Sequence, residues 1–142
     1  MKKSIVYEKV KEFKKKYPMT ISWRLKKHSE LVEKHLQKDE EVLYAFAAQK
    51  NNNPFDIITR SVVVITNDRI IMGQKRLFFV YFLTNITSEM LNDLTIRMGL
   101  IWGKVCIDTI KEVVYLSNIQ RDALTEIQNQ IVEHIMTNDD EQ

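Results

Sequence analysis

The sequence has little of what several protein classes require. Its 142 residues include one cysteine, three glycines and two prolines, which excludes an internal disulfide and a flexible glycine- or proline-rich linker. The longest apolar run, Leu77 to Leu83, is far shorter than the roughly 20 residues of a membrane-spanning helix. A charged pattern follows Met1 where a secretion signal would place an apolar segment. We therefore expect a single cytoplasmic domain, consistent with the lone Cys106.

Charge is distributed unevenly along the chain. Counted in the sequence, residues 1–38 hold 12 Lys/Arg against 4 Asp/Glu, a net charge of +8. Residues 39–142 hold 9 against 15, a net charge of −6. The split predicts a basic helical N-terminal extension over 1–37, a domain over 38–137 and an acidic tail over 138–142. The nearest acidic surface for the extension to meet is the chain's own domain.

Two amphipathic helices are predicted in the extension. In residues 4–17 apolar side chains recur every three to four positions, Ser4 suits the N-cap, and Pro18 ends the pattern. A second helix is predicted from about Ser22 to Gln37, with Ser22 as its cap. Basic side chains fill the other faces of both helices: Lys9, Lys11, Lys14, Lys15, Lys16, Arg24, Lys26 and Lys27.

Short strands are predicted after the extension, followed by one more helix. Asn67-Asp68 suits a tight hairpin turn because both residue types tolerate positive φ. The final helix is predicted over 117–136, with Ser117 or Asn118 as its cap and an apolar stripe of Leu124, Ile127, Ile131 and Ile135. The strand candidates are 42–49, 61–65, 70–75, 77–83, 93–98, 104–108 and 112–116.

The hairpin carries the segment Val64-Ile65-Thr66-Asn67-Asp68-Arg69-Ile70-Ile71. Together with the aromatic strand 77–83, the turn Gly99 to Gly103 and the final helix, it resembles the bacterial pleckstrin-homology-like (PH-like) domain family over about 36–136, in particular its YokE-like branch. The resemblance implies a mainly β fold with helices: a seven-stranded PH-like barrel or curled sheet capped by a C-terminal α-helix. Eukaryotic relatives often bind inositol phosphates through a basic first hairpin. Here that loop offers only Lys50 and Arg60, which argues against phosphoinositide binding.

Residue types that enzymes use are present, but not in catalytic patterns. The sequence has no Gly-rich phosphate loop, nucleophile elbow or zinc-ligand spacing. His28 and His35 are seven residues apart, about 10 Å along a helix, which is too far to share one metal comfortably. Cys106 would need an activating base, and sequence alone does not bring His134 near it. We expect no enzyme, no cofactor, no metal and no small-molecule substrate.

Two surfaces are candidates for binding. The basic helices could lie on an anionic membrane, follow a nucleic-acid backbone, or pack on the chain's own domain; no nucleic-acid-binding motif supports the second option. The aromatic strand places large side chains on both faces, so some of them should point outward. Either the N-terminal helices cover this outward set, or it binds a protein partner or a second copy. The candidate interaction residues are Phe78, Phe79, Tyr81, Phe82 and Trp102.

These observations favour a non-enzymatic protein-interaction or assembly module. The alternative is a peripheral protein that binds anionic membranes through its basic N-terminal amphipathic helices. Nucleic acid is the least favoured partner. The sequence does not name a specific ligand.

Overall fold

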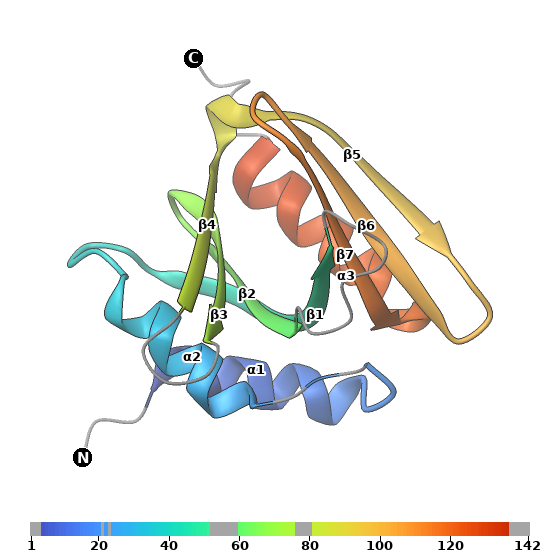
Figure 1. Ribbon diagram of the computed structural model, residues 1–142, viewed down its shortest axis with the longest axis horizontal. Coiled ribbons are helices and arrows are strands. Elements are labelled where there is room, and N and C mark those ends of the chain that lie inside the picture. Colours follow the sequence, from blue (N-terminus) through green and yellow to red (C-terminus); the bar gives the residue numbers. More distant parts are fainter. Residues whose placement is uncertain (1–3, 21, 23, 52–59, 76–80, 137–142) are drawn as a thin grey trace.

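The fold is a seven-stranded antiparallel curled half-barrel with one helix packed against it and two further helices at the N-terminus (Figure 1). It is seen in a computed structural model that describes residues 4–20, 22, 24–51, 60–75 and 81–136. The helices are α1 (Ile5–Lys16), α2 (Leu25–Lys34) and α3 (Leu124–Ile131), with 3₁₀ turns η1 (Ser88–Met90) and η2 (Arg121–Ala123) and a π-helical turn η3 (Val132–Met136). The strands are β1 (Val42–Asn51), β2 (Arg60–Thr66), β3 (Arg69–Lys75), β4 (Tyr81–Thr87), β5 (Leu91–Met98), β6 (Trp102–Thr109) and β7 (Val113–Gln120).

The strands lie in the order β4-β3-β2-β1-β7-β6-β5. Most neighbours are consecutive in the chain; the exception is the pairing of Gln49 to Asn51 at the end of β1 with Tyr115 to Ser117 of β7. That pairing bends the sheet into two parts, β1–β4 and β5–β7 (Figure 1). The edge strands of the described sheet are therefore β4 and β5.

The concave side of the sheet holds the main core. The apolar stripe predicted for the final helix is confirmed, because Leu124, Ile127, Ile131 and Ile135 are all buried there. They pack against large inward side chains of the strands, including Phe46, Ile65, Ile70, Ile107 and Leu116. Burial of the four stripe residues contributes on the order of 6–12 kcal/mol before the entropy of ordering is subtracted.

The convex side of β1–β3 is also buried, under α1 and α2. Val6 and Val10 of α1 and Val32 of α2 contact Ala45 of β1, Val62 and Val64 of β2, and Ile71 of β3. The helix α2 approaches β3 so closely that a Cβ on Gly73 would lie 2.4 Å from Val32 Cγ2. The run Val62 to Ile65 is buried on both faces for this reason, as continuous apolar strands usually are.

The predicted hairpin at Asn67-Asp68 is confirmed, but for another reason than positive φ. Among the described non-glycine residues only Arg24 and Asn118 have positive φ. The turn is held instead by the Thr66 hydroxyl, which accepts hydrogen bonds from the backbone N–H of Asp68 and of Arg69, both at 3.1 Å.

Several predicted boundaries are wrong. The second helix starts at Leu25 rather than near Ser22, and its N-cap is Arg24 in the left-handed region (φ 54°) without a side-chain cap. Residues Ser117 and Asn118 belong to β7, which continues to Gln120, so the last helix starts later than expected and neither residue caps it. By contrast, Ser4 caps α1 as expected and accepts a hydrogen bond from Tyr7 N–H.

Candidate interaction surfaces

The basic extension lies on the domain with its apolar face buried. In α1, Val6, Val10 and Phe13 are buried, and in α2, Leu31 and Val32 are. The rings of Phe13 and Tyr17 pack against each other at a centroid distance of 5.1 Å, and Phe13 packs on Phe46 at 5.8 Å. The described apolar face of each helix is thus already covered by the sheet. That leaves lysines, rather than an amphipathic face, to contact a membrane through these helices.

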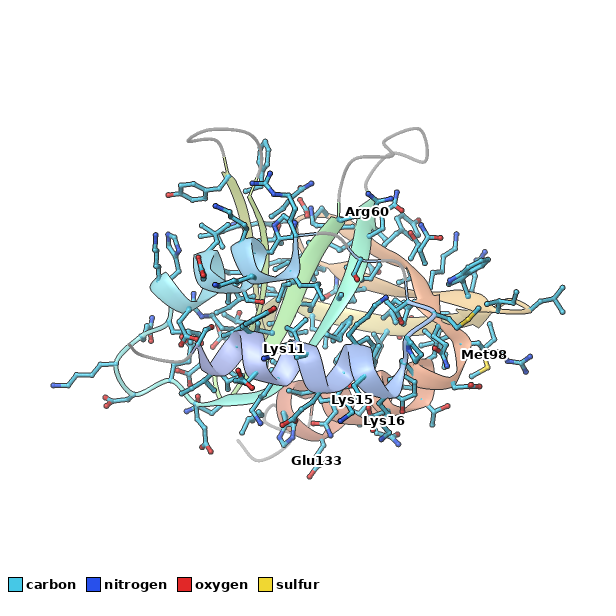
Figure 2. The ribbon with its side chains drawn as sticks, turned by 90° about the horizontal axis from the view of Figure 1, so that it is seen from below. Lys11, Lys15, Lys16, Arg60, Met98 and Glu133 are labelled. Carbon is cyan, nitrogen blue, oxygen red and sulfur yellow. The ribbon has the colours of Figure 1, made fainter. Side chains whose placement is uncertain are left out.

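The predicted basic contacts take several different roles. Lys11 forms an ion pair with Glu8 at 3.1 Å, and Lys14 donates to the backbone carbonyls of Pro18 and Thr20, which fixes the turn after α1. Partial burial lowers the pKa of Lys14. Lys9 and Arg24 are half-buried, whereas the remaining predicted contacts are exposed, namely Lys15, Lys16, Lys26 and Lys27. Figure 2 shows Lys11, Lys15 and Lys16 in succession along α1.

A polar bridge joins α1, β1 and α3. Lys16 Nζ lies 2.7 Å from Glu126 Oε1, and the Tyr44 hydroxyl donates to Glu126 Oε2 at 2.7 Å. Burial alone would raise the pKa of Glu126, but the hydrogen bonds from Lys16 and Tyr44 hold that pKa below its ordinary value. Burial first, and then the bond to Glu126, raise the pKa of Tyr44. The bridge fixes the end of α1 over the helix that covers the main core.

A second bridge ties the extension to the hairpin between β2 and β3. Arg69 donates to both carboxylate oxygens of Glu40, at 2.8 and 2.9 Å, and to the carbonyl of His35 just after α2, at 3.0 Å. The Thr66 hydroxyl also donates to Glu40 at 2.6 Å. The hydrogen bonds from Arg69 outweigh burial and lower the pKa of Glu40 to about 2. The Thr-Asn-Asp-Arg turn therefore has a structural role here.

The aromatic strand is described only in part. Phe78 and Phe79 lie outside the described residues, and the described strand β4 begins at Tyr81. Tyr81 and Phe82 are 48% and 51% exposed, so α1 and α2 do not cover them. The Tyr81 ring lies 5.6 Å from the ring of His35, an exposed residue at the end of α2. Tyr81 and Phe82 remain candidates for contact with a partner.

A cleft runs beside β4 and separates it from the turn between β6 and β7. Its volume is about 370 Å³, near the lower end of the range of small-molecule clefts. The backbone N–H of Ile110 donates to the carbonyl of Met90 at 2.9 Å and so connects this turn to η1. The lining residues are Leu83, Thr84, Asn85, Ile86, Met90, Thr109, Lys111 and Glu112.

The turn between β5 and β6 forms a second exposed apolar surface, which we call the hairpin tip and define as Met98, Leu100, Ile101 and Trp102. Leu100 is 94% exposed and Met98 is 48% exposed. Trp102 was predicted as an interaction residue and does lie at the surface, although on the opposite part of the sheet from Tyr81 and Phe82. The structure therefore divides the described members of the predicted set between two separate surfaces, with Tyr81 and Phe82 on one and Trp102 on the other.

The structure places Cys106 and His134 on different elements. Cys106 lies on β6, where it pairs with Thr95 and with Tyr115, whereas His134 lies in η3. Asp93 and Asp108 are register partners at the end of β5 and β6 that is away from the hairpin tip. Among the described residues, no group of three or more His, Cys, Asp or Glu side chains is arranged to hold a metal ion. No helix in the described ranges is both long and apolar enough to span a bilayer.

The order of strands, the covering helix α3 and the Thr66–Arg69 turn agree with one protein family. A model of the bacterial PH domain matches residues 36–133, more than half of the chain. The chain belongs to the bacterial PH domain family. A comparison with curated proteins found no match. The matched range begins just after α2, so α1 and most of the basic extension lie outside the PH domain itself.

Sequence reasoning missed most of the hairpin tip. It treated Gly99 to Gly103 as a turn and selected only Trp102 as a contact residue. The available signal was the segment Met98 to Gly103, which is apolar apart from its glycines and lies between Arg97 and Lys104. Ordinary turns are polar, so an apolar turn between basic residues indicates a surface that contacts something.

Proposed function

We propose that this PH domain is a non-enzymatic protein-interaction module that receives an extended segment of a protein partner along the edge of β4. The observation that carries the proposal is the position of β4: within the described sheet it pairs with β3 on one side only, and a cleft follows its other side. An edge strand presents backbone N–H and C=O groups to which a further strand can bond.

The side chains at this edge suit such a partner. Tyr81 and Phe82 supply half-exposed aromatic surface at the start of the strand, and aromatic residues are enriched at protein interfaces. Leu83 and Ile86 line the cleft together with the polar side chains of Thr84 and Asn85. An added strand would thus gain backbone hydrogen bonds for affinity and side-chain pockets for selectivity.

The partner can be another protein or a second copy of this chain, and the same edge serves both. A bulky charged side chain at an exposed aromatic position would repel either one without disturbing the buried core. Membership of the YokE-like branch stays a prediction beside this proposal.

The test uses a phage-displayed library of random linear peptides, selected on the full chain. We expect enriched peptides to slow amide hydrogen exchange in residues 81–87 and to lose binding to the Phe82→Lys variant. Light scattering after size exclusion, run in parallel, tests a second copy as partner: a dimer that Phe82→Lys converts to a monomer also supports the edge.

Tyr115→Lys is the matched control, because Tyr115 is similarly exposed but lies on β7 in the other part of the sheet. It should leave both measurements unchanged. Enriched peptides that slow hydrogen exchange only outside β4 would contradict the proposal. So would a chain that is monomeric and on which the selection enriches no peptide.

A further inference from the structure

The hairpin tip is an apolar surface that the fold holds in solvent. Leu100 at its apex is 94% exposed, and Met98, Ile101 and Trp102 flank it with exposed surface of their own. Met19, which follows α1, adds a further exposed apolar side chain beside Trp102. Figure 1 shows the turn between β5 and β6 projecting beyond α3 and the rest of the half-barrel. Contiguous exposed apolar groups of this kind commonly mark a contact surface.

Three hydrogen bonds fix the conformation of the hairpin tip. Gly99 N–H donates to the Trp102 carbonyl at 2.9 Å, which closes the turn. Arg121 N–H donates to the Ile101 carbonyl at 2.8 Å, and the Trp102 indole donates to the Met19 carbonyl at 2.7 Å. These bonds attach the tip to η2 and to the segment after α1. Because the backbone is fixed in this way, Leu100 has little freedom to fold back onto the domain.

Positive charge surrounds the base of the tip. Arg97 and Lys104 are register partners on β5 and β6, one residue below Met98 and Gly103, and both are exposed. Arg121 is exposed beside Ile101. In Figure 2, Lys15 and Lys16 lie on the half of α1 that is nearer to Met98.

Little negative charge offsets these basic side chains. Glu126 is paired with Lys16, whereas Asp122 accepts a hydrogen bond only from the neutral Gln120 side chain and keeps its charge next to Arg121. Asp93 and Asp108 lie at the opposite end of the same strands, about 13 Å from Arg97 at the usual rise of a β-strand. The two strands are thus basic at the apolar end and acidic at the other.

We propose that the hairpin tip inserts into the interface of an anionic lipid bilayer. Leu100 would enter the boundary between headgroups and acyl chains, while Trp102 would lie at headgroup level, where tryptophan is enriched. Arg97, Lys104 and Arg121 would contact the acidic headgroups around it. The opposite charge of the strands' far ends would orient the domain with β4 and its cleft away from the point of insertion. This surface is separate from the edge of β4 and does not depend on that proposal.

The test is sedimentation of the full chain with vesicles of equimolar phosphatidylcholine and phosphatidylglycerol, compared with vesicles of phosphatidylcholine alone. We expect binding to the first and not to the second, and weakening by added salt. Leu100→Ser should lower the affinity about tenfold, the size expected for losing one inserted aliphatic side chain. Arg97→Gln should lower it less and reduce its dependence on salt.

Ile110→Ser is the matched control, because Ile110 is an exposed aliphatic residue in the turn between β6 and β7, at the other end of β6. It should bind vesicles as the unchanged protein does. Failure of the full chain to sediment with anionic vesicles at low salt overturns the proposal. Vesicle binding that is unchanged in the Leu100→Ser variant also overturns the proposal, because the lysines of α1 would then account for the binding. A tip whose change alters the oligomeric mass but not vesicle binding is a protein contact, which also overturns the proposal.

Discussion

The N-terminal helices and the hairpin tip combine the same kinds of residues but differ in what covers them. Each places apolar side chains next to lysines or arginines. In α1 and α2 the buried apolar side chains are covered by the domain: Val6, Val10 and Val32 lie against the convex face of β1–β3, and Phe13 packs on Phe46 of the main core. Several lysines of these helices remain at the surface. In the hairpin tip the apolar side chains themselves remain at the surface.

The difference lies in what the rest of the chain provides. The convex face of β1–β3 is apolar, through Ala45, Val62, Val64 and Ile71, so it needs a cover and the helices supply one. The hairpin extends past α3 (Figure 1), and Leu100 at its apex stays 94% exposed. A segment that combines apolar and basic residues is therefore expected to make a contact. The tertiary structure decides whether that contact is with the chain's own domain or with another molecule.

The largest expected effect on stability comes from introducing an aspartate into each of the two regions in turn. Val10→Asp puts a carboxylate into the closed contact between α1 and the sheet, which should lower the free energy of unfolding by about 4 kcal/mol or more. Leu100→Asp at the exposed apex should change it by no more than about 0.5 kcal/mol. Urea unfolding followed by circular dichroism measures both. Equal losses in the two variants would mean that the tip is not a free surface.

The next effect concerns the bridge between the extension and the PH domain. Arg69→Ala leaves Glu40 without its charged partner and removes the bond to the His35 carbonyl. We expect a loss of about 3 kcal/mol, because one member of a largely buried ion pair remains. Arg97→Ala, at an exposed position on β5, is the control and should be near neutral. If limited proteolysis does not then cleave α2 faster, the bridge does not hold the helices in place.

The free energy of unfolding should also fall at acid pH because Glu40 becomes protonated. Its pKa is lowered from 4.5 to about 2, so the folded state releases this proton more readily than the unfolded state. The stabilisation is fully present above pH 4.5 and is lost as the pH falls toward 2, and allowing for solvent screening it amounts to about 2 kcal/mol. Glu40→Gln should flatten this part of the curve of unfolding free energy against pH. An unchanged slope in that variant would assign the dependence to other carboxylates.

The smallest of these effects tests how the hairpin is attached. A Cβ on Gly103 would lie 2.3 Å from Leu124 Cδ1 and 2.6 Å from the Arg97 carbonyl oxygen. Gly103→Ala should therefore displace α3 or β5 and cost about 1 to 2 kcal/mol in thermal or urea unfolding. Vesicle binding by this variant would show whether membrane contact by the tip depends on the packing of Gly103 against α3 and β5. A neutral Gly103→Ala would mean that the hairpin bends easily and is not braced.

Much of the fold was readable from short patterns. The hairpin segment Val64 to Ile71 and the stripe Leu124, Ile127, Ile131 and Ile135 led to the PH-like half-barrel with its C-terminal helix, and both are confirmed. Boundaries were less accurate, because Ser117 and Asn118 resemble helix caps locally while β7 gains more by continuing its pairing with β6. Local capping preferences are about 1 kcal/mol, which sheet pairing and core burial readily exceed.

The sequence by itself determined which residues are apolar, with what period, and where the chain must turn. That was sufficient for the family and for the helices of the extension. Only the tertiary structure decided that α1 and α2 cover the convex face of β1–β3, that Glu40 and Arg69 meet, and that Leu100 remains in solvent. The physical reason is that burial depends on which surfaces the folded chain brings together, and periodicity specifies a face without specifying its partner.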